Sequence, residues 1–250
     1  MSEISFENFG YVAKKVGYSN VNISSSRYNF QEKHMPLILE SIKNKLKISH
    51  NDTLLDIGCG LGLFLIPLSF FCKNAIGLDH INFIKQIKAN FKFFKSENLI
   101  SGNFLKLKLK KRFNKILIYS VVHYLSSEKE FQKFIDKALF LLQKNGILLV
   151  GDVPIQEYEK VFLNSKEGKK YYHQFENLKK KYKKKNLDFS IVNFLDKRAK
   201  DKNLIKIDLK MLKNIKKKLK RKKFKIKILR HNKQSIFSNT RVDLIIEKNK

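Results

Sequence analysis

The fold of this chain is decided by one stretch of its sequence, Leu54-Leu55-Asp56-Ile57-Gly58-Cys59-Gly60-Leu61-Gly62. Its first half is an apolar run typical of a buried strand, and its second half carries a glycine at every other position. Glycine adopts backbone conformations that other residues rarely reach, so a glycine-rich loop lets the backbone approach a ligand closely. A helix after the loop would point its free N–H groups at the same ligand. We therefore expect a strand, a binding loop and a helix in succession.

The glycine spacing and the acid before it separate two kinds of cofactor loop. A dinucleotide-binding loop reads GxGxxG, and the helix that follows it faces a pyrophosphate. Here the spacing is GxGxG, and Asp56 stands two residues before Gly58. A carboxylate at that place argues against a pyrophosphate and suits a cofactor that carries a cationic amino group.

A second acid lies at the end of the next apolar run. Residues 75–78 read as a strand, and Asp79 follows them about twenty residues after the loop. A carboxylate there can accept hydrogen bonds from both hydroxyls of a ribose. Enzymes that bind NAD share this acid, so Asp79 indicates a nucleoside-binding α/β sheet without identifying the cofactor.

Together these residues resemble motif I of the class I S-adenosylmethionine-dependent methyltransferases, of the small-molecule type. The family pattern Asp-x-Gly-x-Gly-x-Gly is matched by Asp56, Gly58, Gly60 and Gly62. The resemblance implies a Rossmann-like, seven-stranded and mostly parallel α/β sheet with helices on both faces and a reversed terminal strand. It also implies S-adenosylmethionine as methyl donor and S-adenosylhomocysteine as product. No metal ion is expected, because His34, His50, His173 and His231 have no Cys, Asp or Glu at metal-ligand spacing.

The cofactor contacts that the resemblance implies come from the loop, the second acid and the ends of later strands. These residues are Asp56, Gly58, Cys59, Gly60, Gly62, Asp79, His80, Asn103, Phe104 and Ser120. Asn103 departs from the family, which commonly has an acid there that contacts the adenine amino group. The asparagine carbonyl can still accept from that amine, and Phe104 is expected to pack against the adenine ring. His80 is expected either near the adenine or at the surface, where the next helix begins.

The catalytic candidates lie after the fourth and fifth expected strands. The segment Ser120-Val121-Val122-His123-Tyr124 resembles the part of the family that lies beside the transferable methyl group. Methyl transfer mainly needs a positioned acceptor and removal of its proton, and histidine titrates in the useful range. His123 is therefore the first candidate, followed by Tyr124 and Asp152. The alternatives are that His123 only packs beside the cofactor and that Asp152 caps the turn before Pro154.

Alternating short apolar runs and longer periodic stretches predict βα units on a parallel sheet. Strands are expected at residues 53–57, 75–78, 99–101, 115–119 and 146–150, with a terminal pair at 224–229 and 242–247. Helices are expected at residues 31–46, 61–71, 81–94 and 129–143, and at residues 211–219 with Asp208 as N-cap. Residues 1–30 are expected to form an N-terminal arm or short helical cap. Residues 31–250 would form the methyltransferase domain, with a lysine- and aromatic-rich insertion at about 155–205.

The charge of the chain is strongly positive, at +31 for 53 basic and 22 acidic residues. Such a field attracts polyanions, but only six of the basic residues are arginine, which reads phosphate and guanine better than lysine does. The charge therefore indicates nonspecific attraction, and we favour solvated faces over binding surfaces for the lysine runs.

Several classes of protein are disfavoured by the sequence. Residues 1–10 lack the basic and apolar regions of a signal peptide, so a cytoplasmic protein is expected. The longest apolar run, residues 61–72, is interrupted and too short to span a membrane. The two cysteines, Cys59 and Cys72, are too few for a disulfide framework or a zinc site and are expected to be reduced.

The function predicted from these residues is methyl transfer from S-adenosylmethionine to an oxygen or nitrogen of a small metabolite, such as a sugar or phosphorylated precursor of a surface glycan. A small acceptor is favoured because residues 120–123 lack the Asn/Asp-Pro-Pro-Tyr/Phe tetrapeptide of DNA amino-methylating enzymes. One alternative is an RNA methyltransferase whose lysines follow phosphates. The other is a non-catalytic scaffold protein with a cofactor fold, which the intact Asp56, Gly58, Gly60 and Asp79 disfavour. The oligomeric state is left open.

Overall fold

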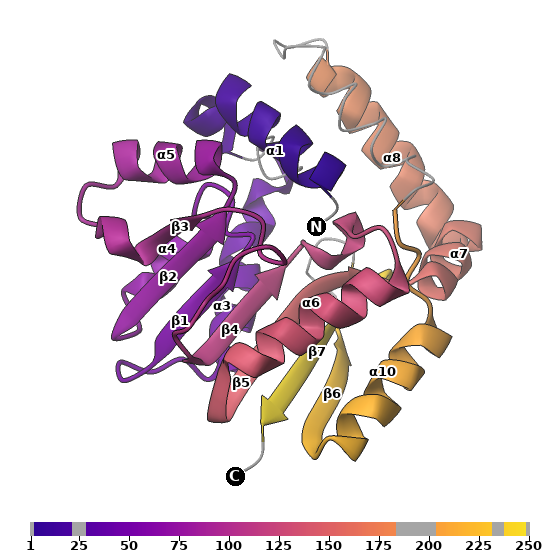
Figure 1. The fold of residues 1–250 in the computed structure, drawn as a ribbon. Coiled ribbons are helices and arrows are strands. Elements are labelled where there is room, and N and C mark those ends of the chain that lie inside the picture. Colours follow the sequence, from indigo (N-terminus) through magenta and orange to yellow (C-terminus); the bar gives the residue numbers. More distant parts are fainter. Residues whose placement is uncertain (1–2, 22–28, 184–203, 232–237, 249–250) are drawn as a thin grey trace.

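Seven strands form a single sheet in the order β3-β2-β1-β4-β5-β7-β6 (Figure 1). The computed structural model describes residues 3–21, 29–183, 204–231 and 238–248. The strands are β1 (Thr53–Ile57), β2 (Asn74–Asp79), β3 (Leu99–Ser101), β4 (Phe113–Tyr119), β5 (Leu142–Pro154), β6 (Phe224–Arg230) and β7 (Arg241–Lys248). All seven lie where the apolar runs predicted them, although β5 extends beyond the expected 146–150 at both ends.

The strands are parallel except for the last one. β1 pairs in parallel with β2 and β4, as do β2 with β3 and β4 with β5. β7 is antiparallel to both of its neighbours, β5 and β6, so it alone is reversed. The predicted Rossmann-like, mostly parallel sheet with a reversed terminal strand is confirmed. The parallel strands therefore share one carboxyl edge, where open α/β sheets bind their ligands.

Helices cover both faces of the sheet. They are α1 (Glu3–Lys15), α3 (Met35–Leu46), α4 (Leu65–Ser69), α5 (Ile81–Asn90), α6 (Glu128–Leu141), α7 (Gln156–Asn164), α8 (Lys166–Lys183) and α10 (Leu209–Arg221). Short 3-10 turns are η1 (Gly17–Asn20), η2 (Asn29–His34), η3 (Ser96–Asn98) and η4 (Val122–Tyr124). The buried side chains of α3, α4 and α5 pack on one face of the sheet, and those of α6 and α10 pack on the other.

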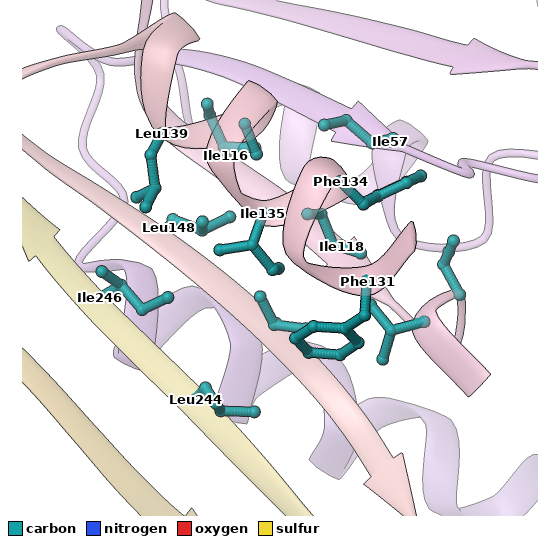
Figure 2. Close-up of a cluster of buried hydrophobic side chains, with 14 of the residues drawn as sticks. Ile57, Ile116, Ile118, Phe131, Phe134, Ile135, Leu139, Leu148, Leu244 and Ile246 are labelled. Atoms are coloured by element: carbon teal, nitrogen blue, oxygen red, sulfur yellow. The ribbon is translucent and has the colours of Figure 1, made fainter. Parts of the chain in front are cut away.

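The larger of the two cores lies between α6, α10 and the middle of the sheet. Figure 2 shows Phe131, Phe134 and Ile135 of α6 directed at the strand residues below them. Their spacing places them on one face of a helix whose first turn is capped, because the Ser127 hydroxyl accepts a hydrogen bond from the Glu130 N–H at 3.2 Å. The strand side chains in this cluster include Ile116, Ile118, Leu148, Leu244 and Ile246.

Helix α10 has the N-cap and apolar stripe that the sequence predicted. The Asp208 carboxylate accepts a hydrogen bond from the Met211 N–H at 2.6 Å. Its buried residues are Met211, Leu212, Ile215 and Leu219. The lysines Lys213, Lys217 and Lys220 on the opposite side of the helix are exposed. For the described part of this helix, a solvated lysine face is the arrangement found.

The helix predicted at residues 61–71 is shorter than expected. α4 covers only Leu65–Ser69, because Gly60 and Gly62 have φ angles of 54° and 82°, which a right-handed helix excludes. Pro67 also removes one backbone donor from the remaining turn. The helix that follows the glycine loop is therefore only five residues long.

The N-terminal segment is a helix rather than a loose arm. α1 spans 13 residues and buries Phe9, Val12 and Ala13 against the body of the domain. After β5, helices α7 and α8 form the start of the segment expected as an insertion, and the Gln156 N–H donates to the Ile207 carbonyl at 3.0 Å where the chain returns. Residues 22–28 of the expected arm and 184–203 of the expected insertion lie outside the described residues.

Among the helices that the structure describes, none combines the length and apolarity needed to cross a membrane.

Candidate functional site

The glycine loop follows β1 and is hydrogen-bonded to the end of β2. The Gly58 N–H donates to the Leu78 carbonyl at 2.8 Å, and the Gly60 N–H donates to the Asp79 carboxylate at 2.7 Å. Both glycines have positive φ angles, of 80° and 54°. The loop is therefore held against β2 by its own backbone, and the predicted ribose acid is one of the groups that hold it.

The two glycines differ in what surrounds them. A Cβ added to Gly58 would lie 2.4 Å from Cγ2 of Val121, so the packing at this position excludes any side chain. A Cβ added to Gly60 would meet no other atom within 4 Å. Gly60 thus borders open space at the carboxyl edge of the sheet, as a loop that receives a ligand must.

Asp56 is a buried carboxyl group at the end of β1, with 3% of its surface exposed. Burial, and then the nearby charge of Asp79, raises its pKa to about 8. Of the residues that the structure describes, none donates a hydrogen bond to this carboxyl group. A buried acid without donors is costly to ionise, and a cationic ligand would supply what it lacks.

Asp79 is buried beside Asp56 and accepts two backbone hydrogen bonds. They come from the Gly60 N–H and from the His80 N–H, the latter at 2.6 Å. Burial raises the pKa of Asp79 to about 6, although these two bonds act in the opposite direction. A carboxylate can accept about four hydrogen bonds, so its remaining lone pairs can still receive ribose hydroxyls.

His80 begins α5, but it is not at the surface. Its Nδ1 accepts a hydrogen bond from the Asn82 N–H at 3.1 Å, and its Nε2 lies 3.3 Å from the carboxylate of Glu7. The ring is buried beneath α1, where Gly10 approaches so closely that an added Cβ would lie 2.2 Å from it. The surface alternative is therefore wrong, because α1 covers this residue.

Asn103 and Phe104, which were predicted to contact the adenine, both make contacts within the chain. The Asn103 side-chain oxygen accepts a hydrogen bond from the Leu105 N–H at 3.0 Å, which closes a local turn. Phe104 is buried in the core, with its ring centroid 4.8 Å from that of Phe134 on α6. The core contact accounts for the burial of Phe104 without a cofactor.

Ser120 and Asp152 meet at the ends of β4 and β5. The Ser120 hydroxyl donates to the Asp152 carboxylate at 2.6 Å, and the two residues have φ angles of 59° each. Such left-handed conformations are strained for residues other than glycine and gather at functional sites. Asp152 lies within β5, which continues through a bulge to Pro154.

His123 and Tyr124 lie in the turn η4, directly after β4. Their ring centroids are 4.2 Å apart, and the Tyr124 ring makes an edge contact with Phe9 of α1 at 4.7 Å. The Tyr18 hydroxyl, from η1, donates to the Leu61 carbonyl of the glycine loop. The N-terminal segment therefore closes over both the loop and the candidate catalytic turn.

A buried acid-base group near Asp152 was missed by the sequence analysis. The Asp243 carboxylate of β7 lies 2.7 Å from Nε2 of His231 and 2.5 Å from Nζ of Lys45, and it accepts the Asp152 N–H at 2.9 Å. No Cys, Asp or Glu stands at metal-ligand spacing from His231, so local spacing does not indicate this group. The available signal was Asp243 itself, a charged residue inside the otherwise apolar strand 242–246.

Both cysteines are free thiols, Cys59 in the loop and Cys72 after α4. Burial raises the pKa of the Cys59 thiol well above its ordinary value, which makes it a poor nucleophile and metal ligand. In the described ranges, no group of three or more His, Cys, Asp or Glu side chains is placed to hold a metal ion.

Parts of the chain are similar in sequence to known proteins. Residues 55–150, from β1 to β5, match a family described as "Methyltransferase domain". The ubiquinone biosynthesis O-methyltransferase of Pelagibacter ubique is 31% identical over 134 residues, which cover 49% of this chain and 53% of that protein. The chain thus spans about half the length of this curated relative.

Solved structures extend the likeness of fold to nearly the whole chain. An S-adenosylmethionine-dependent methyltransferase from Clostridium acetobutylicum superposes with a TM-score of 0.57 at 13% identity, and the match covers 98% of this chain and 99% of that one. The N-methyltransferase NodS of Bradyrhizobium japonicum, solved with S-adenosyl-L-homocysteine, gives a TM-score of 0.56 at 12% identity with the same coverage. The fold is thus that of S-adenosylmethionine-dependent methyltransferases, and residues 55–150 carry the match to a methyltransferase domain.

Proposed function

We propose that this protein transfers the methyl group of S-adenosylmethionine to an oxygen or nitrogen atom of a small metabolite. The observation that carries the proposal is Asp56, a buried carboxyl group without a donor, next to the open space at Gly60. The cationic amino group of the cofactor would meet Asp56, and its ribose would meet Asp79. Bound there, the cofactor supplies a methyl group on an already activated sulfonium.

The residues of the chain would then position the acceptor and receive its proton. His123 and Tyr124 follow β4, the strand next to β1 in the sheet, so they belong to the same carboxyl edge as the loop. We assign proton removal from the acceptor to His123, and we assign acceptor positioning to Tyr124 and to Asp152, which Ser120 already holds by a hydrogen bond.

A small acceptor is supported by the position of the N-terminal segment. Phe9 rests on Tyr124, and η1 is tied to the loop at Leu61, so described protein covers part of the site. The names of the relatives include an O- and an N-methyltransferase, in keeping with either acceptor atom. A sugar or a phosphorylated precursor of a surface glycan is the narrower candidate.

Titration calorimetry with S-adenosylmethionine tests the donor site directly. We expect one binding site per chain, and an absence of heat and of thermal stabilisation would reject the assignment. With a mixture of candidate acceptors, the formation of S-adenosylhomocysteine reports transfer. His123→Ala should then lower kcat more than cofactor affinity, whereas an unchanged rate would reduce this residue to a packing role.

Transfer to RNA is the second candidate, supported by the exposed lysines of α10. If the lysines follow phosphates, RNA retention should fall steeply as salt rises. Absence of RNA binding near physiological salt would remove this candidate and leave the small acceptor.

A further inference from the structure

Three exposed phenylalanines lie together at the edge of the sheet opposite the donor site. Phe70 and Phe71 follow α4 and are 65% and 38% exposed, and Phe93 follows α5 and is 57% exposed. The ring centroids of Phe70 and Phe93 are 5.6 Å apart, so the two segments form one apolar surface. Scattered exposed apolar residues are normal, but a contiguous aromatic group marks an interaction surface.

Lysines surround these rings. Lys73, Lys92 and Lys95 are exposed in the same two segments, and Nζ of Lys43 on α3 lies 4.1 Å from the ring centroid of Phe71. From residue 70 to residue 96 the only acid is Asp79, which is buried at the other end of β2. We call Phe70, Phe71, Phe93, Lys73, Lys92 and Lys95 the aromatic-lysine patch.

The topology places this patch away from the cofactor loop. Its two segments precede β2 and β3, so they lie where the parallel strands begin (Figure 1). The loop at Gly58 and the acid Asp79 lie where β1 and β2 end. A partner on the patch would therefore leave the donor site open.

We propose that the aromatic-lysine patch docks the protein on the surface of an anionic lipid bilayer. Phenylalanine side chains enter the boundary between headgroups and acyl chains, and lysines around them are attracted by the negative surface potential. Apolar surface and positive charge are both needed for such a contact, and the patch joins them in one place. Docked in this way, the protein presents its carboxyl edge to the aqueous side.

The arrangement of the rings favours a bilayer over single-stranded RNA. Bases stack on ring faces that are separately accessible. Here Phe93 is packed edge-on against Phe91, at a centroid distance of 5.8 Å, and tilted against Phe70. The three rings therefore pack on one another and do not leave separate ring faces on which successive bases could stack.

Cosedimentation with vesicles tests the proposal on the full chain. The probes are vesicles of phosphatidylcholine with phosphatidylglycerol, and vesicles of phosphatidylcholine alone. We expect binding to the anionic vesicles that weakens about tenfold in the double variant F70S/F93S. The matched control is Phe140→Ser, because Phe140 on α6 is 64% exposed and lies outside the patch. This control should bind as the unchanged protein does.

A second pair of variants separates the patch from the overall charge. K73E/K92E should weaken binding by about fivefold or more per lysine, while K213E/K217E on α10 makes the same change of net charge and should have little effect. Equal losses in the two pairs would overturn the proposal, as would full vesicle binding by F70S/F93S. It would also be overturned if F70S/F93S abolished binding to an oligouridylate, or self-association, and left vesicle binding intact. Unchanged thermal melting and binding of S-adenosylmethionine verify that each variant is folded.

Discussion

Buried carboxyl groups at the two halves of the sheet's carboxyl edge have pKa values that are shifted in opposite directions. We call these halves the β1 half, with β1 and β2, and the β7 half, with β5, β6 and β7. At the ends of β1 and β2, Asp56 and Asp79 have raised pKa values because burial is not matched by positive partners. At the start of β7, burial also acts to raise the pKa of Asp243. There, however, the hydrogen bonds and charges of His231 and Lys45 outweigh burial and lower it.

The difference is whether the buried carboxyl group has positively charged partners within the chain: Asp243 does, whereas Asp56 would need them from a ligand. A buried charge is tolerated when it is paired and hydrogen-bonded, and it is destabilising when it is not. Asp243 has its partners within the chain, and it ties β7 to α3, to His231 after β6 and to the Asp152 N–H of β5. Among the described residues Asp56 has no such partner, so its burial costs stability that a cationic ligand would restore.

The largest expected effect on stability comes from removing the charge of Asp243 in the β7 half. Asp243→Asn removes the charge that compensates Lys45 and His231, and loss of one member of a buried pair costs about 3–5 kcal/mol. Urea denaturation near neutral pH should show this loss in the free energy of unfolding. Because the pKa of Asp243 is lowered, its contribution is present above the ordinary carboxyl range and fades in acid, so the gap between variant and unchanged protein should narrow there.

Asp136→Asn is the matched control for this change. Asp136 pairs with Lys222 at 2.9 Å and with Lys218 at 3.6 Å, but these three side chains are 35–47% exposed. Exposed pairs contribute about 0–1 kcal/mol, so the control should be nearly neutral. Equal losses for both substitutions would contradict the distinction between the two halves.

The strands and the positions of Asp56 and Asp79 could be predicted because they depend on local sequence. The limits of β1 follow from an apolar run that is followed by glycines, and the two acids stand at or near the ends of such runs. The group around Asp243 could not be predicted in this way. His231 meets Asp243 only through the pairing of β6 with β7, and Lys45 reaches it from a helix 198 residues earlier in the chain.

The length of α1 also depends on packing. Residues 1–30 were expected as a loose arm or short helical cap, and Gly10 stands in the middle of α1, where glycine weakens an isolated helix. The structure supplies the reason for this glycine, which is the contact with the His80 ring. Tertiary packing thus outweighs the low helix propensity of Gly10. The contact between Gly10 and His80 could not be predicted because the two residues are far apart in the sequence.

Asp79→Ala tests the proposed contact between Asp79 and the ribose of the cofactor. Hydrogen bonds to a charged group contribute about 1.5–3 kcal/mol, so the affinity for S-adenosylmethionine should fall between about tenfold and a hundredfold. Calorimetry measures the change. An unchanged affinity would contradict the placement of the ribose at this acid. Because the Gly60 N–H also loses its acceptor, the melting temperature without ligand should be recorded alongside.

Asp56→Asn should stabilise the protein, whereas Asp243→Asn should destabilise it. The folded chain holds the Asp56 proton up to about pH 8, whereas the ordinary value is 3.8, so the folded state loses stability as pH rises between these values. The asparagine variant lacks this loss. It should be more stable by about 2 kcal/mol near pH 8, after allowing for a buried amide, and no more stable near pH 4.

The same variant should bind S-adenosylmethionine less well, because the amino group of the cofactor loses its carboxylate. In the unchanged protein, affinity should rise with pH toward 8 as Asp56 becomes easier to ionise. A melting series and a calorimetric series across this pH range measure both effects. Stability that is equal for the two proteins at every pH would show that Asp56 does not hold a proton in the folded state.

The smallest expected effect on stability lies inside the loop, at Gly60. Gly60→Ala places a side chain at a φ of 54°, which costs about 1 kcal/mol, but the new Cβ meets nothing within 4 Å. Gly58→Ala is the matched change, and it should cost about 3 kcal/mol or more because its Cβ would lie 2.4 Å from Val121. If the open space at Gly60 receives the cofactor, Gly60→Ala should still weaken binding of S-adenosylmethionine severalfold. Full affinity in this variant would place the cofactor elsewhere on the carboxyl edge, because a methyl group would then be tolerated where the ligand must make its closest approach to the backbone.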